Sequence, residues 1–177
     1  NDNLIKILNF SKKIEVKFIV IPLVDNGLIE NIYHEKKLIK ICKQIKKKLK
    51  IYGVKIVFES DFNPVKLKKF IKQFDKNFFG INYDVGNSAC LGFDINSEFK
   101  NYGKNIYNIH IKDRVKSGKS VRLGKGDANF VDLYKNLRKI NYNGNLILQT
   151  ARSKINKEFE EVKNNLVFLK KFHSEKK

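Results

Sequence analysis

Residues 107–127 read YNIHIKDRVKSGKSVRLGKGD, and this stretch holds the pattern that decides the fold. Polar and apolar side chains alternate over residues 107–111, as expected of a short strand, and His110 stands near its end. A basic, glycine-containing loop follows and closes with a Gly-Lys-Gly turn. A histidine at the end of a strand, opening onto a cationic loop, marks a candidate site for chemistry.

The same order of strand and helix recurs along the chain. Apolar, β-branched segments predict strands at residues 16–22, 54–58, 81–84, 106–111 and 146–149. Amphipathic helices follow these strands, except after the third strand, where only a weak helix is predicted over residues 97–102. Strands that alternate with helices predict an α/β fold with a parallel sheet, and no linker divides residues 1–177, so we expect a single domain.

Bulk composition sets limits on the class of protein. The longest apolar run, residues 18–24, is interrupted by Pro22 and is far shorter than the ~20 residues of a membrane span. Scattered charges near the N-terminus do not resemble a signal peptide. Cys42 falls on an apolar helical stripe, which favours a packed thiol in a reducing compartment. We therefore expect a cytoplasmic protein without a membrane partner.

The formal net charge of +19 raises the question of a nucleic-acid partner. Almost all of the positive charge comes from lysine, whereas proteins that grip phosphate backbones rely on the bidentate fork of arginine. Lysine, asparagine and isoleucine are abundant together, as in proteins of AT-rich genomes. The charge is therefore interpreted as a solvated lysine surface, and a nucleic-acid partner is not expected.

Polar side chains stand at the ends of four consecutive predicted strands, namely Glu59, Asp84, His110 and Gln149. The carboxyl ends of parallel strands lie on one face of the sheet, where active sites are built. A set of carboxylate, imidazole and amide ligands suits one divalent metal ion, such as Mn²⁺, Mg²⁺, Co²⁺ or Zn²⁺.

Each of these residues also has a purely structural interpretation. Glu59 could cap the turn that follows it, and Asp84 could form an Asx-turn with Gly86. His110 could be a hydrogen-bonded, half-buried histidine, and Gln149 could be an amide within the core. The occurrence of one such residue on each of four strands favours the metal site.

The loop after His110 is strongly basic. Its cations are Lys112, Arg114, Lys116, Lys119, Arg122 and Lys125. Such a run is often a solvated face, but its position beside the candidate site favours an anionic small-molecule substrate such as a sugar phosphate. The Gly-Lys-Gly turn is weak evidence for phosphate binding, and either Asp127 or Asn129 is expected to cap the helix that starts near Phe130.

Four segments carry a resemblance to a known family: GINYDVGNSACLGFD, IHIKDR, VRLGKGDANF and YNGNLILQTAR. Together they resemble the C-terminal half of xylose isomerase-like TIM barrels, specifically sugar-phosphate isomerases and epimerases of the hexulose-phosphate and ribulose-phosphate 3-epimerase type. The resemblance covers about residues 18–152 and implies a partial TIM (β/α)8 barrel, whose five βα units are similar to strands four to eight. It implies the metal ligands Glu59, Asp84, His110 and Gln149, and the substrate-facing residues Asn87 and Arg114.

The sequence departs from that family at its last ligand, where Gln149 replaces the usual glutamate. In the epimerases the two glutamates form the acid/base pair, and an amide cannot accept the proton, although its carbonyl oxygen can still bind a metal. Glu59 then remains as a single base, which suits a 1,2-isomerisation better than a 3-epimerisation. Loss of catalysis, leaving a sugar-binding barrel, is a further alternative.

Length is the second departure, because a full barrel needs about 250 residues. The resemblance implies that three βα units are absent and that sheet edges are exposed. We therefore expect a fragment of a longer protein that is marginally stable alone unless a partner covers the exposed edges of the sheet. Assembly into a homo-oligomer is a further alternative. The same superfamily includes metal-dependent endonucleases acting on DNA, but those bring more metal-binding histidines than the three in this chain.

Overall fold

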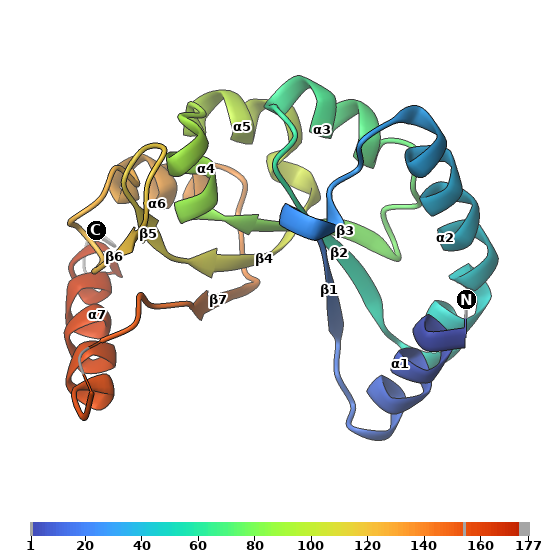
Figure 1. Cartoon of the computed structure of the whole chain (residues 1–177), viewed down its shortest axis with the longest axis horizontal. Helices are drawn as coiled ribbons and strands as arrows, with labels where there is room; N and C mark the ends of the chain where they lie inside the picture. Colours follow the sequence, from blue (N-terminus) through green and yellow to red (C-terminus); the bar gives the residue numbers. More distant parts are fainter. Residues whose placement is uncertain (1, 154, 174–177) are drawn as a thin grey trace. The chain divides into compact units, whose positions relative to one another are not determined.

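The structure, a computed structural model, describes residues 2–153 and 155–173. Its main sheet has five parallel strands in the order β1-β2-β3-β4-β7 (Figure 1). The strands are β1 (Phe18–Leu23), β2 (Lys55–Ser60), β3 (Phe79–Asp84), β4 (Ile106–Ile111) and β7 (Asn145–Leu148). The predicted α/β fold and all five predicted strands are confirmed, with ends that differ by one or two residues.

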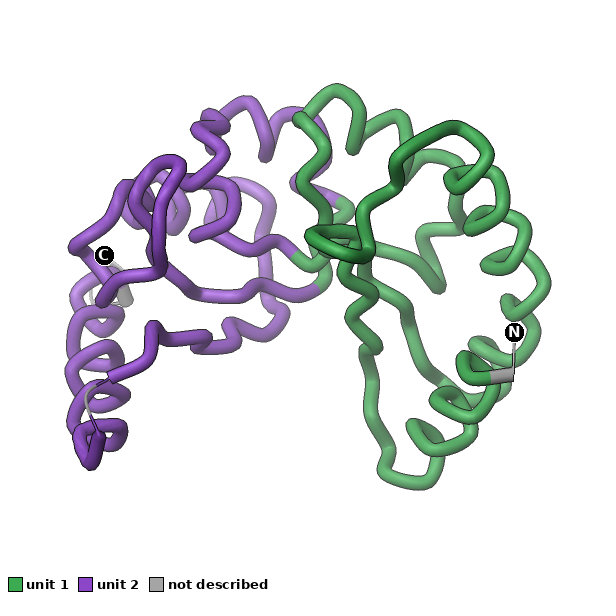
Figure 2. The backbone as a smooth tube through the Cα atoms, viewed as in Figure 1, with its two compact units in different colours: residues 1–82, 105–107 green, residues 83–104, 108–177 purple. Residues whose placement is uncertain are grey.

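The chain forms two compact units (Figure 2). Unit 1 consists of Asn1–Asn82 and Asn105–Tyr107, and unit 2 consists of Tyr83–Lys104 and Asn108–Lys177. The helices of unit 1 are α1 (Asp2–Lys13), η1 (Asp25–Gly27), α2 (Ile32–Tyr52) and α3 (Pro64–Ile71). Unit 2 contains α4 (Val85–Leu91), α5 (Ile95–Tyr102), α6 (Phe130–Lys139), α7 (Glu158–His173) and the short ribbon of β5 (Asp113–Arg114) and β6 (Ser120–Val121), and η2 (Gly103–Asn105) precedes β4.

Local sequence signals explain the helix ends of unit 1. The Asn31 side chain accepts a hydrogen bond from the backbone N–H of His34 at 3.0 Å and so begins α2. Gly53 ends the same helix with φ of +68°, a conformation that glycine adopts without strain. Asn63 caps α3, and Pro64 occupies its first turn as predicted.

An aromatic cluster forms the core of unit 1. Phe58 of β2 packs edge-on against Phe70 of α3 at 5.3 Å between ring centroids, and it stacks with Phe79 of β3 at 6.1 Å. Phe74 contacts all three rings. Such ring pairs stabilise a core beyond the effect of area alone, and here they fix the strand on which Glu59 directly follows Phe58.

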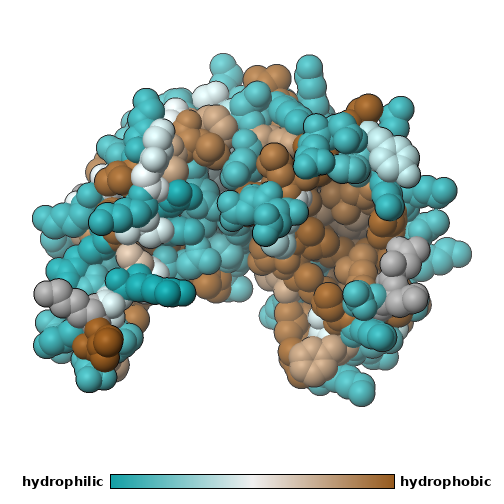
Figure 3. Space-filling view, viewed as in Figure 1, coloured by the Kyte–Doolittle hydropathy of each residue, from teal (hydrophilic) through white to brown (hydrophobic). Residues whose placement is uncertain are grey.

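Unit 1 also keeps apolar side chains in contact with solvent. Ile7 and Phe10 of α1 are exposed, as is Ile14 directly after that helix. Figure 3 shows a hydrophobic surface in the region of α1 and β1. β1 is an end strand of the sheet order, and the described residues supply no strand for its outer edge. The exposed edge expected from the sequence is therefore present.

Unit 2 differs from the prediction after β3, where two helices stand in place of one weak helix. The Asp84 side chain caps α4 through the backbone N–H of Asn87 at 2.8 Å, and Asp94 caps α5. Gly92 ends α4 with φ of +72°. The sequence VGNSACL has low helix propensity, so its periodicity did not reveal α4. Asn129, one of the two predicted caps, does cap α6.

No helix within the described residues is long and apolar enough to cross a membrane.

The Cys42 thiol should be chemically inert in the folded chain. Cys42 lies on α2 with none of its surface exposed, and burial raises the pKa of its thiol to about 12. Because the thiolate is the reactive form, we expect labelling at about pH 8 to be about a thousandfold slower than in guanidinium chloride. A thiol-specific dye with peptide mapping measures this rate, and equal rates in both states would contradict the packing of α2.

Candidate functional site

Asp84 ends β3 and uses its two carboxylate oxygens differently. Oδ1 accepts the capping hydrogen bond from the backbone N–H of Asn87 at 2.8 Å. Oδ2 lies 3.9 Å from Nδ1 of His110 and 3.6 Å from Nζ of Lys112. The predicted turn-forming role of Asp84 is confirmed, although the bond goes to Asn87 rather than to Gly86. The other oxygen of the same buried side chain lies near His110 and Lys112, and its role as a metal ligand stays a prediction.

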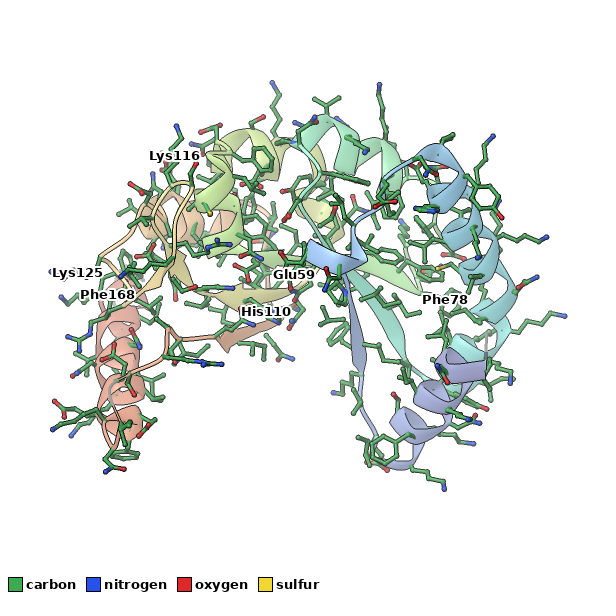
Figure 4. The ribbon with its side chains drawn as sticks, viewed as in Figure 1. Glu59, Phe78, His110, Lys116, Lys125 and Phe168 are labelled. Carbon is green, nitrogen blue, oxygen red and sulfur yellow. The ribbon has the colours of Figure 1, made fainter. Side chains whose placement is uncertain are left out.

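His110 lies on β4, as predicted, and 15% of its side chain is exposed (Figure 4). Two metal–ligand bonds of about 2.1 Å place their donor atoms about 3–4 Å apart. The 3.9 Å between the Asp84 carboxylate and the His110 imidazole therefore fits a shared divalent cation. Carboxylate and imidazole are also ligands that Mn²⁺, Co²⁺ and Zn²⁺ accept.

Glu59 belongs to unit 1, where it lies near the carboxyl end of β2. The side-chain amide of Asn82 on β3 donates a hydrogen bond of 2.8 Å to Oε2 of Glu59. Asn82 is not among the site residues predicted from the sequence. A polar residue within a buried strand, two positions before Asp84 and so on the same face, was the signal that could have revealed it.

Two cationic side chains meet at Asn87 in unit 2. The Asn87 Oδ1 atom accepts from Arg114 Nη1 at 3.0 Å and from Lys112 Nζ at 3.4 Å. Arg114 also donates to the carbonyl of Gly118 from Nε at 3.2 Å and from Nη2 at 2.8 Å. The predicted substrate-facing residues Asn87, Lys112 and Arg114 are thus brought together, within reach of Asp84.

Gly86 allows the Lys112 side chain to pack closely against the start of α4. A Cβ atom at Gly86 would lie 2.8 Å from Cγ of Lys112 and 3.1 Å from its backbone carbonyl carbon. Any larger residue would push the Lys112 side chain away from Asp84 and Asn87. The glycine of the Asp-x-Gly-Asn pattern is therefore explained by the lysine that packs against it.

Gln149 follows β7 directly, and its side chain is exposed. Its backbone N–H donates to the carbonyl of Ile111 at 2.9 Å and extends the pairing of β7 with β4 by one residue. The alternative of a buried core amide is therefore wrong. Its role as a metal ligand stays a prediction.

The Gly-Lys-Gly turn binds an anion that belongs to the chain itself. Asp113, with 1% of its surface exposed, accepts hydrogen bonds from the backbone N–H groups of Gly124 at 2.8 Å, Gly126 at 2.9 Å and Ala128 at 3.1 Å. Backbone amides of one turn that converge in this way on one anion form an anion-binding nest. Since Asp113 fills the nest, this turn is a structural element of the loop and not a phosphate site.

The remaining loop cations point elsewhere. Arg122 forms a two-bond ion pair with Glu161 of α7, at 2.7 and 2.5 Å, which joins the loop to that helix. Lys116, Lys119 and Lys125 are exposed, and Figure 4 labels two of them. Of the six predicted loop cations, only Lys112 and Arg114 therefore face the candidate site.

Removing the Asp113 carboxylate should destabilise unit 2. Asp113→Ala leaves three part-buried backbone N–H groups without their acceptor, and we expect a loss of about 3 kcal/mol in the free energy of unfolding. Urea denaturation measures the change. Asp127→Ala is the control, because exposed Asp127 accepts a single backbone bond from Lys116, so equal losses in the two variants would contradict this role.

The family described as "Xylose isomerase-like TIM barrel" matches residues 1–172, in agreement with the resemblance seen in the sequence. A protein of Escherichia coli strain K12, provisionally named L-ribulose-5-phosphate 3-epimerase SgbU, is 31% identical over 104 residues. That alignment covers 55% of this chain and 36% of the relative.

Solved structures show the same fold. The xylose isomerase domain protein from Planctomyces limnophilus superposes with a TM-score of 0.80 at 18% identity, over 94% of this chain and 63% of that one. The IOLI protein, solved with a bound zinc atom, gives 0.76 at 19% identity, over 93% of this chain and 66% of that one. The chain thus spans less than two thirds of the first structure and about a third of the Escherichia coli relative.

Proposed function

Because the chain belongs to the xylose isomerase-like TIM barrel family, we propose that it is a metal-dependent isomerase or epimerase acting on a sugar phosphate. The observation that carries the proposal is the buried Asp84 carboxylate, whose Oδ2 lies near both His110 and Lys112. Lys112 and Arg114 in turn donate to Asn87. The Asp84 carboxylate thus belongs to the proposed pair of metal ligands and also lies beside Lys112, a cation proposed to bind the substrate. The name of the Escherichia coli relative and the zinc of the IOLI protein support this assignment.

We assign the metal to Glu59, Asp84, His110 and Gln149. The order of the sheet supports this set, because β2, β3, β4 and β7 are consecutive and parallel strands carry their carboxyl ends at one edge. Asp84 and His110 supply the pair with the fitting separation, and the Glu59 carboxylate is oriented by Asn82. When bound, a divalent cation such as Mn²⁺, Mg²⁺, Co²⁺ or Zn²⁺ polarises the substrate carbonyl.

The remaining residues handle the substrate and its proton. Lys112 and Arg114 bind the anionic substrate, and Asn87 holds the two cations in place. Glu59 removes the proton from the carbon beside the carbonyl, while the electron pair of that C–H bond moves toward the carbonyl oxygen and an enediolate forms. Glu59 then returns the proton to the former carbonyl carbon, since Gln149 cannot act as a second base. The hydroxyl proton of the neighbouring carbon moves to the former carbonyl oxygen, so that the new carbonyl forms on the carbon that lost its hydrogen. This sequence of steps gives a 1,2-isomerisation.

Gln149 favours a second candidate function, a sugar-binding barrel without catalysis. Its exposed amide stands where the resemblance to the epimerases implies a glutamate, so the chain retains a ligand oxygen there and lacks the second base. Gln149→Glu distinguishes the two functions. If the variant and the parent are both inactive on every ketose phosphate tested while both bind metal, the binding function is favoured.

Metal affinity should depend on Asp84 and His110, two of the three proposed ligands in unit 2. We expect Asp84→Ala and His110→Ala each to weaken Mn²⁺ binding by about 100-fold or more. Loss of a residue that only hydrogen-bonds to a metal ligand typically weakens binding by about 10- to 100-fold. Isothermal titration calorimetry measures the affinity. His34→Ala is the control, because His34 lies on α2 and is exposed. Unchanged Mn²⁺ affinity in both site variants would contradict the metal assignment.

Proton exchange tests the chemistry. With Mn²⁺ and a pentulose 5-phosphate in D2O, the parent should incorporate deuterium at the carbon beside the carbonyl, as measured by NMR. Glu59→Gln should abolish the exchange while the overall fold is kept, because the amide cannot accept the proton. Lys125→Ala, which alters an exposed cation of the loop, should exchange like the parent. Exchange that persists in Glu59→Gln would show that another residue is the base.

A further inference from the structure

Unit 2 buries a carboxyl group that the proposed chemistry does not use. Glu98 of α5 is 2% exposed, and three hydroxyl groups donate to it. Tyr83 OH lies 2.7 Å and Ser88 Oγ 2.5 Å from Oε2, while Tyr102 OH lies 2.6 Å from Oε1. Both oxygens of Glu98 are therefore fixed by hydrogen bonds.

This arrangement is a costly way to stabilise a core. All three donors are neutral hydroxyls, and a buried carboxyl without a cation is less favourable than apolar side chains of similar volume. Burial raises the pKa of the Glu98 carboxyl and of the Tyr83 and Tyr102 phenols. A contribution to stability therefore does not explain why a carboxyl group is buried here. Unlike an apolar cluster, its hydrogen bonds hold the neighbouring side chains in fixed positions.

The hydroxyls bonded to Oε2 flank the candidate site in the sequence. Tyr83 directly precedes Asp84, and Ser88 directly follows Asn87. One carboxylate oxygen therefore ties together both ends of the segment that carries Asp84 and Asn87. Tyr102 differs, because it lies four residues along α5 from Glu98 and its hydroxyl donates to the other oxygen, Oε1. Its ring also contacts that of Tyr83, at 6.4 Å between centroids, and Tyr102→Phe keeps this ring contact while removing the hydroxyl.

The hydrogen bonds to Glu98 are needed because α4 has little intrinsic stability as a helix. It has seven residues, one of which is Gly86, and short helices with glycine are marginal by themselves. Its capping bond from Asn87 N–H to Asp84 Oδ1 also sets where Oδ2 faces His110. Fraying of the first turn would therefore move Asp84 and Asn87 together.

We propose that Glu98 is a positioning residue, which through Tyr83 and Ser88 fixes the β3–α4 junction so that Asp84 faces the metal and Asn87 faces the substrate-binding cations. The inference rests on the proposed function. Glu98 itself acts only through its neighbours, and it contacts neither metal nor substrate.

Two matched variants test this role. Tyr83→Phe and Tyr102→Phe each remove one hydroxyl from the same carboxyl group, so their melting temperatures should fall by similar amounts. We expect Tyr83→Phe to weaken Mn²⁺ binding about tenfold, as for other outer-shell partners, and Tyr102→Phe to change it by less than about twofold. Calorimetric titration with Mn²⁺ alone measures both, and Ser88→Ala should behave like Tyr83→Phe.

Three results are informative. Weaker binding in Tyr83→Phe and Ser88→Ala, with parent-like binding in Tyr102→Phe, supports the positioning role. Equal Mn²⁺ affinities in all three variants, with the parent still binding the ion, overturn that role and leave the metal site intact. A parent chain that does not bind Mn²⁺ overturns the proposed function and this inference with it.

Discussion

The carboxylate of Asp84 takes part both in the fold and in the candidate site. One oxygen begins α4, and the other lies beside His110 and Lys112, so the direction of the strand, the start of the helix and the site geometry are set together. A buried carboxylate is costly unless it is hydrogen-bonded and its charge is compensated, and here the backbone N–H of Asn87 donates to Oδ1 while the Lys112 ammonium lies 3.6 Å from Oδ2. Gly86 completes the arrangement, since only a residue without a side chain lets Lys112 pack so closely.

Charge in the loop after β4 is divided between structure and function. Asp113 fills the nest of backbone amides, and Arg122 is paired with Glu161, so these groups shape the loop and attach it to α7. Lys112 and Arg114 are the cations that converge, and they converge on Asn87 rather than on each other. The high net charge therefore matters less than the position of two cations beside one carboxylate.

The sequence was sufficient for the elements with strong patterns. Five apolar strands, the stripes of the long helices and the caps at Gly53 and Asn129 follow from local physics and were predicted. Helix α4 was missed, because VGNSACL owes its helix to the Asp84 cap and to tertiary contacts instead of propensity. Asn82 and Glu98 were missed for a related reason. Their hydrogen-bond partners are distant in the sequence: Tyr83 lies 15 positions from Glu98, and Glu59 lies 23 positions from Asn82. The role of such a polar residue can be recognised only from the three-dimensional structure.

Direct observation of the metal ligands tests the central claim, that the carboxyl edge of the sheet binds a divalent cation through His110. The measurement is pulsed electron paramagnetic resonance of the chain loaded with Mn²⁺. The account predicts modulation from a coordinated imidazole nitrogen in the parent and its disappearance in His110→Ala. A spectrum of hydrated Mn²⁺ without nitrogen coupling in the parent would contradict it.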